Sequence, residues 1–438
     1  MSNPKNRISV FSAAALGVGS MIGAGIFTLL GEAGAMAGSA TYLSFLIAGV
    51  IALLSGYSYG KIGARFPSSG GIIEYLHRGL GNNSKSATAS MLFMVSMLIG
   101  LAMVAKTFGN YAVSVFHLEG SVYAADALTV GVICIFIFLN FIGSSVVSKA
   151  EGIIVVIKVI ILTVFMIAGL TYADWYSFAP ATYPGSQSIF GSLAITYFAF
   201  TGFAVITTTA GDMANPKKDL MKAILLAIGF TTVLYVGLAL VVFGNMTPDE
   251  VMVSKETALA QAALPAFGKI GFSIMAITAL LSTSSAINAN IFALLRMSED
   301  ESAYGDLTKT FVKRIWKQGT DGLVIIAVLT IALALFVDLT TIAILGSIAN
   351  LIVTTAIHIG HFRIRKTTEA KTVPLLAAVL LNMGIVLLFF YSADEAERSR
   401  LLIGVAIMIL LSTVLEFVIH KINKSRKDTA LENSSKDE

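Results

Sequence analysis

Long runs of apolar residues alternate with short polar connections along almost the whole chain. Each run is long enough for a helix that crosses a bilayer core, which takes about 20 residues. The pattern predicts about twelve membrane-spanning helices, at roughly residues 8–36, 40–62, 86–116, 121–143, 149–171, 187–213, 219–243, 262–296, 320–338, 340–360, 373–391 and 400–420. We therefore expect an all-α polytopic membrane protein.

Composition excludes a soluble protein. Hydrophobic residues make up 56% of the 438 residues and charged residues only 13%, whereas soluble domains carry about 25% charged residues. A soluble protein this apolar could not cover its surface with polar groups, whereas lipid-facing side chains need no water. The single cysteine, Cys134, cannot form an intramolecular disulfide.

The distribution of positive charge predicts the orientation of the chain. Of the 30 lysine and arginine residues, 24 fall in the two tails and in the connections on the same side of the membrane as the tails. The opposite side holds only four, Lys255, Lys269, Arg398 and Arg400. Because short cytoplasmic loops carry an excess of positive residues, we expect both termini to be cytoplasmic. The net charge of +4 then reflects topology, not nucleic-acid binding.

The first predicted span is interrupted by glycines. Four of them fall within nine residues, at Gly17, Gly19, Gly23 and Gly25. Each costs a helix about 1 kcal/mol relative to alanine. The simpler interpretation is that Gly19 and Gly23 allow close packing against another helix. The alternative is an interrupted helix whose exposed backbone binds a ligand. A dinucleotide-binding loop would need a preceding strand and a βαβ unit, and an apolar helix stands there instead.

A second interruption, in the sixth span, favours the ligand-binding interpretation. Residues 197–203 and the threonine-rich residues 207–211 lie five spans after the first break. Because five is odd, a five-span repeat has inverted topology, and paired interrupted spans in two such halves indicate a transporter site. At 1.5 Å per residue, Ile22 lies ~21 Å and Gly202 ~22 Å into their spans, so both breaks fall near the middle of a ~30 Å core.

Lys158 is the ionisable residue expected nearest the membrane midplane. It stands nine residues, or ~14 Å, into the fifth span, and ionisable residues at such depth are usually functional. Ser284 and Ser285 in the eighth span reach a similar depth. Their hydroxyls either accept hydrogen bonds from Lys158 or bond only to their own helix backbone.

The other ionisable residues carry less information. Glu32 and Lys106 lie in the outer halves of the first and third spans, where they either pair with each other or reach an interface or a watery vestibule. The five histidines stand near predicted span ends or in connections and show no metal-ligand spacing. No nucleophile elbow, phosphate loop or zinc motif is present, so we expect no catalytic residue, metal or cofactor.

Several short motifs follow one another along the chain. The first two are Gly23-Ala24-Gly25-Ile26-Phe27 and Pro67-Ser68-Ser69-Gly70-Gly71. The third is Phe198-Ala199-Phe200-Thr201-Gly202-Phe203, followed by Asp212-Met213-Ala214-Asn215-Pro216. Asn288 and Arg296 stand in the eighth span. In their order and spacing, over about residues 8–420, these motifs together resemble the amino acid–polyamine–organocation (APC) superfamily of secondary transporters.

The resemblance implies a fold of the LeuT type, with an inverted five-plus-five repeat, broken helices 1 and 6, and two extra helices. The chain then divides into a cytoplasmic N-terminal tail (1–7), the first repeat (8–171), the second repeat (187–360), helices eleven and twelve (373–420), and a disordered cytoplasmic tail (421–438).

The resemblance also implies the residues of an amino acid site. Backbone amides of Ala24, Gly25 and Ile26 would bind the substrate carboxylate. Carbonyls of Ile22, Phe198, Ala199 and Thr201 would bind the α-ammonium. Gly202, in the second break, would belong to the same substrate site. Lys158 resembles the lysine that replaces a sodium ion in proton-coupled members, with Ser284 and Ser285 beside it.

The function predicted from these features is amino acid transport by alternating access across the plasma (inner) membrane, independent of sodium. Proton coupling and exchange of one substrate for another both stay open, as does the oligomeric state. An ion channel or ion-only carrier is the main alternative from another class, and a membrane enzyme or receptor is a third. No nucleic acid is expected as a partner, and the absence of a carboxylate at the breaks favours a neutral substrate.

Overall fold

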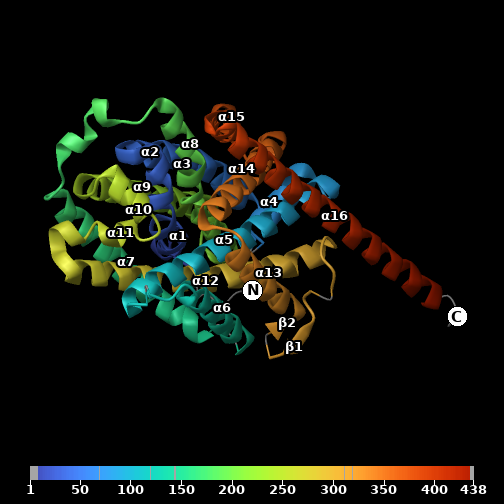
Figure 1. Ribbon diagram of the computed structural model, residues 1–438. Coiled ribbons are helices and arrows are strands. Elements are labelled where there is room, and N and C mark those ends of the chain that lie inside the picture. Colours follow the sequence, from blue (N-terminus) through green and yellow to red (C-terminus); the bar gives the residue numbers. More distant parts are fainter. Residues whose placement is uncertain are drawn as a thin grey trace.

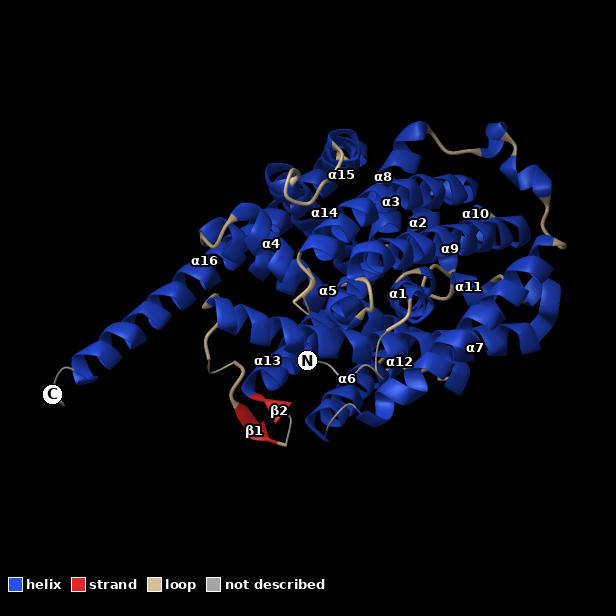
Figure 2. Cartoon of the chain, turned by 180° about the vertical axis from the view of Figure 1, so that it is seen from behind, coloured by secondary structure: helices blue, strands red, loops and turns tan. Residues whose placement is uncertain are grey.

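The computed structural model of the protein describes residues 8–434, apart from residues 69, 119, 143–144, 310 and 318 (Figure 1). The side chains of residues 24, 145–151, 397 and 423–434 also lie outside the description. Within the described residues the chain is almost entirely helical. The exception is a two-stranded antiparallel hairpin, β1 (Arg314–Trp316) and β2 (Gly319–Thr320), which contacts α6 and α13 (Figure 2).

The long elements follow the predicted spans. They are α1 (Val10–Ala24) with α2 (Ile26–Ala37), α3 (Thr41–Arg65), α5 (Ser84–Phe116), α6 (Ala124–Ile142), α7 (Ser145–Leu170), α8 (Ser186–Phe198) with η5 (Thr201–Asp212), α9 (Pro216–Asn245), α12 (Leu264–Tyr304), α13 (Asp321–Phe336), α14 (Leu339–Ile364), α15 (Thr372–Ser392) and α16 (Glu395–Ser434). The short elements are η2 (Gly38–Ala40), α4 (Ile72–Leu80), η3 (Trp175–Phe178), η4 (Pro180–Thr182), α10 (Pro248–Val253) and α11 (Ala258–Gln261).

Ten stretches of the described chain are long and apolar enough to cross a membrane, and Val10–Gly23 and Asp321–Phe336 are shorter apolar helices. One of the ten, Ile26–Arg65, joins α2 to α3. The predicted all-α polytopic membrane fold is confirmed.

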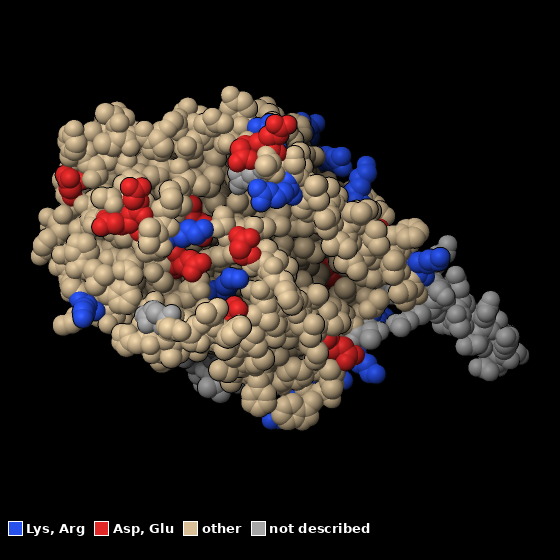
Figure 3. Space-filling model, viewed as in Figure 1, with Lys and Arg blue, Asp and Glu red and all other residues tan. Residues whose placement is uncertain are grey.

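Burial divides the helices into an interior set and a lipid-facing set. α1, α3, α5, α9, α12 and α14 pack against one another and supply much of the buried apolar core. On α7, the side chains of Ile153, Ile160, Val164 and Ile167 are 56–65% exposed, which suits contact with lipid. Figure 3 shows a face on which uncharged atoms dominate and charged side chains are sparse.

Local residue chemistry sets several helix ends. Pro216 stands in the first turn of α9, where its missing N–H costs nothing. Gly81 and Gly305 end α4 and α12 with φ values of 90° and 88°, a conformation that favours glycine.

Two helices extend eight residues or more past their predicted ends. α12 continues to Tyr304 and not only to residue 296, because its cap is Gly305. α16 continues to Ser434, so part of the tail expected to be disordered is drawn as helix. The disorder of residues 421–438 stays a prediction, and residues 435–438 lie outside the described part of the chain.

Candidate functional site

The first span breaks at a single residue. α1 ends at Ala24, α2 begins at Ile26, and Gly25 between them has φ −94° and ψ −78°. The Gly25 N–H donates to the Met21 carbonyl at 2.7 Å, and the Gly25 carbonyl accepts from the Leu29 N–H at 2.8 Å. The side chain of Ala24 lies outside the described residues. The predicted interruption is therefore confined to one residue, and is not an unwound segment.

The sixth span changes helix type instead of unwinding. α8 ends at Phe198, and η5 continues as a 3₁₀-helix of 12 residues, whereas such helices rarely exceed about four residues. Hydroxyls of Thr207, Thr208 and Thr209 each donate to the carbonyl three residues earlier, at 2.6–2.8 Å. These hydroxyls reinforce a helix type whose backbone geometry is otherwise poor.

The two breaks meet at Gly25. A Cβ added there would lie 2.4 Å from the Tyr235 hydroxyl oxygen, 2.6 Å from the Met21 carbonyl oxygen and 2.7 Å from the Ala199 carbonyl oxygen. The Tyr235 hydroxyl donates to the Ala199 carbonyl at 3.4 Å and also lies against the backbone amide of Ile26. Only glycine fits this contact between the first and sixth spans.

Gly202 brings the sixth span equally close to the first. A Cβ at Gly202 would lie 2.6 Å from the Met21 backbone nitrogen. Ile22 is fully buried beside this contact, and the Thr201 hydroxyl donates to the Phe198 carbonyl at 2.8 Å. The structure thus brings together the predicted site residues on both spans.

Aromatic rings form an apolar wall next to the breaks. The ring of Phe200 lies 5.2 Å from Tyr235 and 6.5 Å from Phe45, and the Phe45 and Tyr235 centroids are 5.4 Å apart. All three residues are fully buried. Phe45 lies on α3 and Tyr235 on α9, spans without a break or a buried charge, so no sequence signal marked them.

Lys158 lies where the sequence predicted, on α7 against the first span. Its side chain is fully buried, and its Nζ donates to the Gly19 carbonyl at 2.8 Å. α12 packs against both α1 and α7 and carries Ser285, which is buried, and Ser284, which is partly buried. The Lys158 side chain therefore contacts the first span at Gly19, six residues before the break at Gly25.

Glu32 and Lys106 do not pair with each other. The Glu32 carboxylate accepts from Thr340 at 2.8 Å and pairs with Lys255 at 3.3 Å. Lys106 instead donates to two carbonyls at the end of α13, at 2.9 and 3.0 Å. A lysine suits that position because the last carbonyls of a helix lack partners and carry partial negative charge.

Two histidines near the end of α14 are fully buried. His361 lies in the last turn of α14 and His358 about one turn before it, close to the span end at which they were expected. His358 contacts Ser55 and Ser58 on α3, both at 3.0 Å, and His361 contacts Ser58 at 2.8 Å. These contacts join the ends of α3 and α14.

The Pro67–Gly71 motif positions α4 against the sixth span. Gly71 has φ 56° and begins α4, and its Cβ position lies 3.0 Å from the Thr207 hydroxyl oxygen. Further along α4, burial alone would raise the pKa of Glu74, but hydrogen bonds from Tyr304 and Arg78 lower it below its ordinary value. Glu74 is thus held ionised between α4 and the end of α12.

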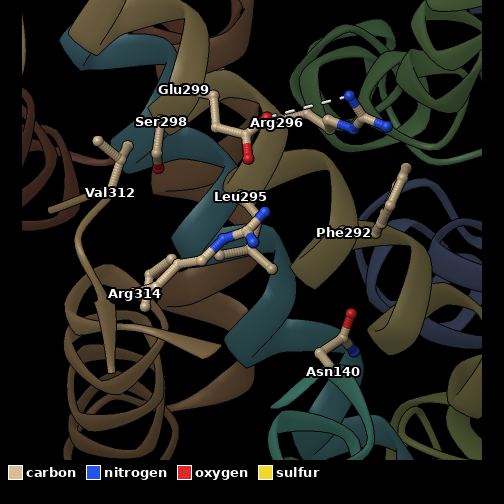
Figure 4. Close-up of a pocket in the computed structure, with 9 residues that line it drawn as sticks. Asn140, Phe292, Leu295, Arg296, Ser298, Glu299, Val312 and Arg314 are labelled. Atoms are coloured by element: carbon tan, nitrogen blue, oxygen red, sulfur yellow. Dashed lines mark ion pairs between the residues drawn. The ribbon is translucent and has the colours of Figure 1, made fainter. Parts of the chain in front are cut away.

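A surface pocket of about 370 Å³ lies beside Arg296, one of the two residues of α12 that fit the family motifs (Figure 4). Arg314 and Glu299 also line it, and Arg296 approaches Glu299 at 3.9 Å. Asn140, at its edge, donates to Asn288 at 3.0 Å. None of the lining residues belongs to the two breaks, so this pocket is separate from the predicted amino acid site.

Comparison with known proteins identifies the family of the chain. Residues 8–413 match the model of the amino acid permease family. The chain is 34% identical over 426 residues to the inner membrane transport protein YbaT of Escherichia coli, covering 97% of this chain and 98% of that protein. It is 26% identical over 429 residues to a methylthioribose transporter of Bacillus subtilis, covering 92% of each.

A further relative is the branched-chain amino acid permease BcaP of Bacillus subtilis, 26% identical over 256 residues and covering 55% of each chain. The family match spans both breaks, Lys158 and all the long helices except the end of α16. The chain is therefore a multi-pass membrane transporter, not an enzyme, and it belongs to the amino acid permease family.

Proposed function

We propose that the chain carries neutral amino acids across the membrane by alternating access, without sodium, and binds them at the two helix breaks. The observation that carries this proposal is the meeting of both breaks at Gly25, where three oxygens lie within 2.7 Å of a Cβ position. The close approach gathers main-chain polar groups of both spans at one point, where a small zwitterion can exchange its own hydrogen bonds for those that the groups make to one another. Non-helical backbone at membrane depth is tolerated only where it lines a cavity or is buried in protein.

The carboxylate of the substrate binds at the start of α2. Ala24, Gly25 and Ile26 stand where a half-helix begins, and helix N-termini favour anions through free N–H groups and the helix dipole. In the structure the Gly25 N–H is bonded to Met21, and the Tyr235 hydroxyl lies against the Ile26 amide. The Tyr235 hydroxyl then takes the polar position of one carboxylate oxygen until substrate enters.

The ammonium group binds among carbonyls of the same two breaks. Ile22 lies on the first span, and Phe198, Ala199, Thr201 and Gly202 lie on the sixth. The substrate side chain packs towards Phe45, Phe200 and Tyr235. Lys255 already balances the charge of Glu32 at its Oε2, to which Thr340 also donates, so a cationic side chain would have to compete with Lys255 for this carboxylate. A neutral side chain fits this environment best.

Lys158 takes the place of a coupling sodium ion. Its ammonium group bonds to the Gly19 carbonyl at 2.8 Å, and broken or kinked helices expose carbonyls that otherwise coordinate sodium. Low-dielectric surroundings disfavour the charged lysine, whereas hydrogen bonds favour it. If the transport cycle changes this balance, Lys158 releases its proton and transport is proton-coupled. If Lys158 stays charged throughout, the protein exchanges amino acids without protons.

The transporter lies in the plasma (inner) membrane with both termini in the cytoplasm, as the charge bias predicts. The test is uptake of radiolabelled amino acids into proteoliposomes, with and without sodium and with an imposed pH gradient. We expect uptake of alanine-like and branched-chain substrates without sodium. Strict sodium dependence contradicts the role of Lys158, and preference for arginine or lysine contradicts the neutral substrate. Stimulation by a pH gradient distinguishes proton coupling from exchange.

A further inference from the structure

Three side chains capable of binding a metal ion converge between α4 and the end of α12. They are His77, Glu301 and Asp306, and one ligand atom from each lies within 4.8 Å of the other two. His77 is on α4, Glu301 is in the last turn of α12, and Asp306 directly follows the Gly305 cap. More than 220 residues separate His77 from the two acids, so no local spacing marks the cluster.

The ring of His77 is held in a fixed orientation. It stacks on the ring of Tyr304, with centroids 3.9 Å apart and an interplanar angle of 10°. The Tyr304 hydroxyl donates to Glu74, which also binds Arg78 at 2.6 Å. This packing directs the His77 Nε2 towards Asp306 Oδ2, at 3.0 Å. The two atoms nevertheless lack the alignment of a hydrogen bond.

The polar atoms of the cluster are buried without satisfying one another. Glu301 is 0% exposed, and within the described residues neither of its carboxylate oxygens has a hydrogen-bond partner. Both ring nitrogens of His77 are also buried without a hydrogen-bond partner among the described residues. The Ser90 hydroxyl approaches Glu301 but lies outside hydrogen-bond geometry. Because unpaired buried polar and charged groups are costly, the cluster calls for a further ligand.

We propose that His77, Glu301 and Asp306 bind a divalent transition-metal cation, with Zn²⁺ the best fit. Zinc accepts imidazole nitrogen and carboxylate oxygen at about 2.0–2.2 Å in tetrahedral geometry, which places ligand atoms about 3.3–3.6 Å apart. The distance of 3.0 Å between His77 Nε2 and Asp306 Oδ2 is close to this value. The ligand atoms of all three residues lie within 4.8 Å of one another, so small side-chain shifts bring them to zinc-binding distances. Imidazole suits zinc, whereas magnesium and calcium prefer oxygen ligands.

The cation can reach the site from the surface, and the three protein ligands leave one coordination position open. Asp306 is 14% exposed and His77 is 3% exposed, so Asp306 lies on the entry side. Three protein ligands leave the fourth tetrahedral position for water. The bound cation ties α4 of the first predicted repeat to α12 of the second, because its ligands come from both.

Zinc binding to the full chain tests this directly and does not depend on transport. We expect the detergent-purified protein, prepared without a polyhistidine tag and stripped with a chelator, to bind one equivalent of Zn²⁺ in calorimetry. Millimolar Mg²⁺ does not compete. Glu301→Gln and His77→Gln each weaken binding at least tenfold. Asp306→Asn, at the most exposed ligand, weakens it without changing the core.

Matched controls separate the site from adventitious binding. Glu299→Gln removes an exposed acid two residues from Glu301, and His117→Ala removes an exposed histidine, and both leave zinc affinity unchanged. Absence of stoichiometric binding in the parent protein overturns the proposal. So does equal affinity in the parent and in folded Asp306→Asn and His77→Gln, with folding judged by gel filtration and melting temperature.

Discussion

Replacing Gly25 by alanine adds one methyl group at the point where the two broken spans meet. The φ of Gly25 is −94°, which L-residues adopt, so the substitution acts through space and not through backbone strain. Its Cβ would lie 2.4 Å from the Tyr235 hydroxyl oxygen and 2.6 and 2.7 Å from the carbonyl oxygens of Met21 and Ala199. Two of these three atoms are backbone and cannot rotate away.

The expected loss follows from these contacts. Overpacking a tight site costs about 1–3 kcal/mol, and the two backbone contacts place Gly25→Ala at about 2–3 kcal/mol. The Tyr235 side chain can shift, but the carbonyls of Met21 and Ala199 crowd the new methyl group with or without substrate, so part of the cost lowers the stability of the protein itself. The part that falls on the bound state sets the loss of affinity. At about 1.4 kcal/mol per tenfold in affinity, substrate binding weakens by up to roughly 30- to 150-fold.

The assay is uptake of radiolabelled substrate into proteoliposomes, with binding followed by the substrate-induced shift in melting temperature. The matched control is Gly229→Ala on α9, because nothing lies within 4 Å of its Cβ position. That variant transports normally. If folded Gly25→Ala keeps the parent KM and maximal rate, the substrate carboxylate does not bind at this break.

Three further predictions concern side chains around the site. Lys158→Ala lowers uptake at least tenfold, because it removes a charge-assisted hydrogen bond worth about 1.5–3 kcal/mol; parent-like uptake contradicts its role. Tyr235→Phe removes the hydroxyl that occupies the carboxylate position before substrate enters and lowers KM about two- to tenfold, since the substrate no longer has to displace a neutral hydrogen bond worth about 0.5–1.5 kcal/mol; an unchanged KM places the carboxylate elsewhere. Glu32→Gln lowers the melting temperature by leaving Lys255 without its anion, and a double-mutant cycle with Lys255→Met measures the coupling; a coupling energy of zero contradicts the pair.

Sequence reasoning succeeded where the membrane imposes a one-dimensional rule. The long apolar runs identified the spans because a helix satisfies its backbone hydrogen bonds within the segment. The glycines at Gly25 and Gly202 marked the breaks because a helix interior disfavours glycine. Lys158 was identifiable because a charge at that depth is costly without a function.

The backbone conformation at the two breaks could not be predicted from the sequence. The first is confined to one residue, Gly25, and the sixth span becomes the 3₁₀-helix η5. Both forms depend on what packs beside them, as the contact of Gly202 with Met21 illustrates. The partner of Glu32 was equally hidden, since Lys255 lies 223 residues away.

The sequence by itself determined the membrane fold, the two interrupted spans and the buried lysine, because each follows from the cost of placing a given residue in lipid. Only the tertiary structure decided which side chains meet: Tyr235 at the break, Lys255 with Glu32, and His77 with Glu301. These contacts join residues on different helices. Helix rotation and packing set them, and hydrophobic periodicity along one chain does not specify which faces of two distant helices touch.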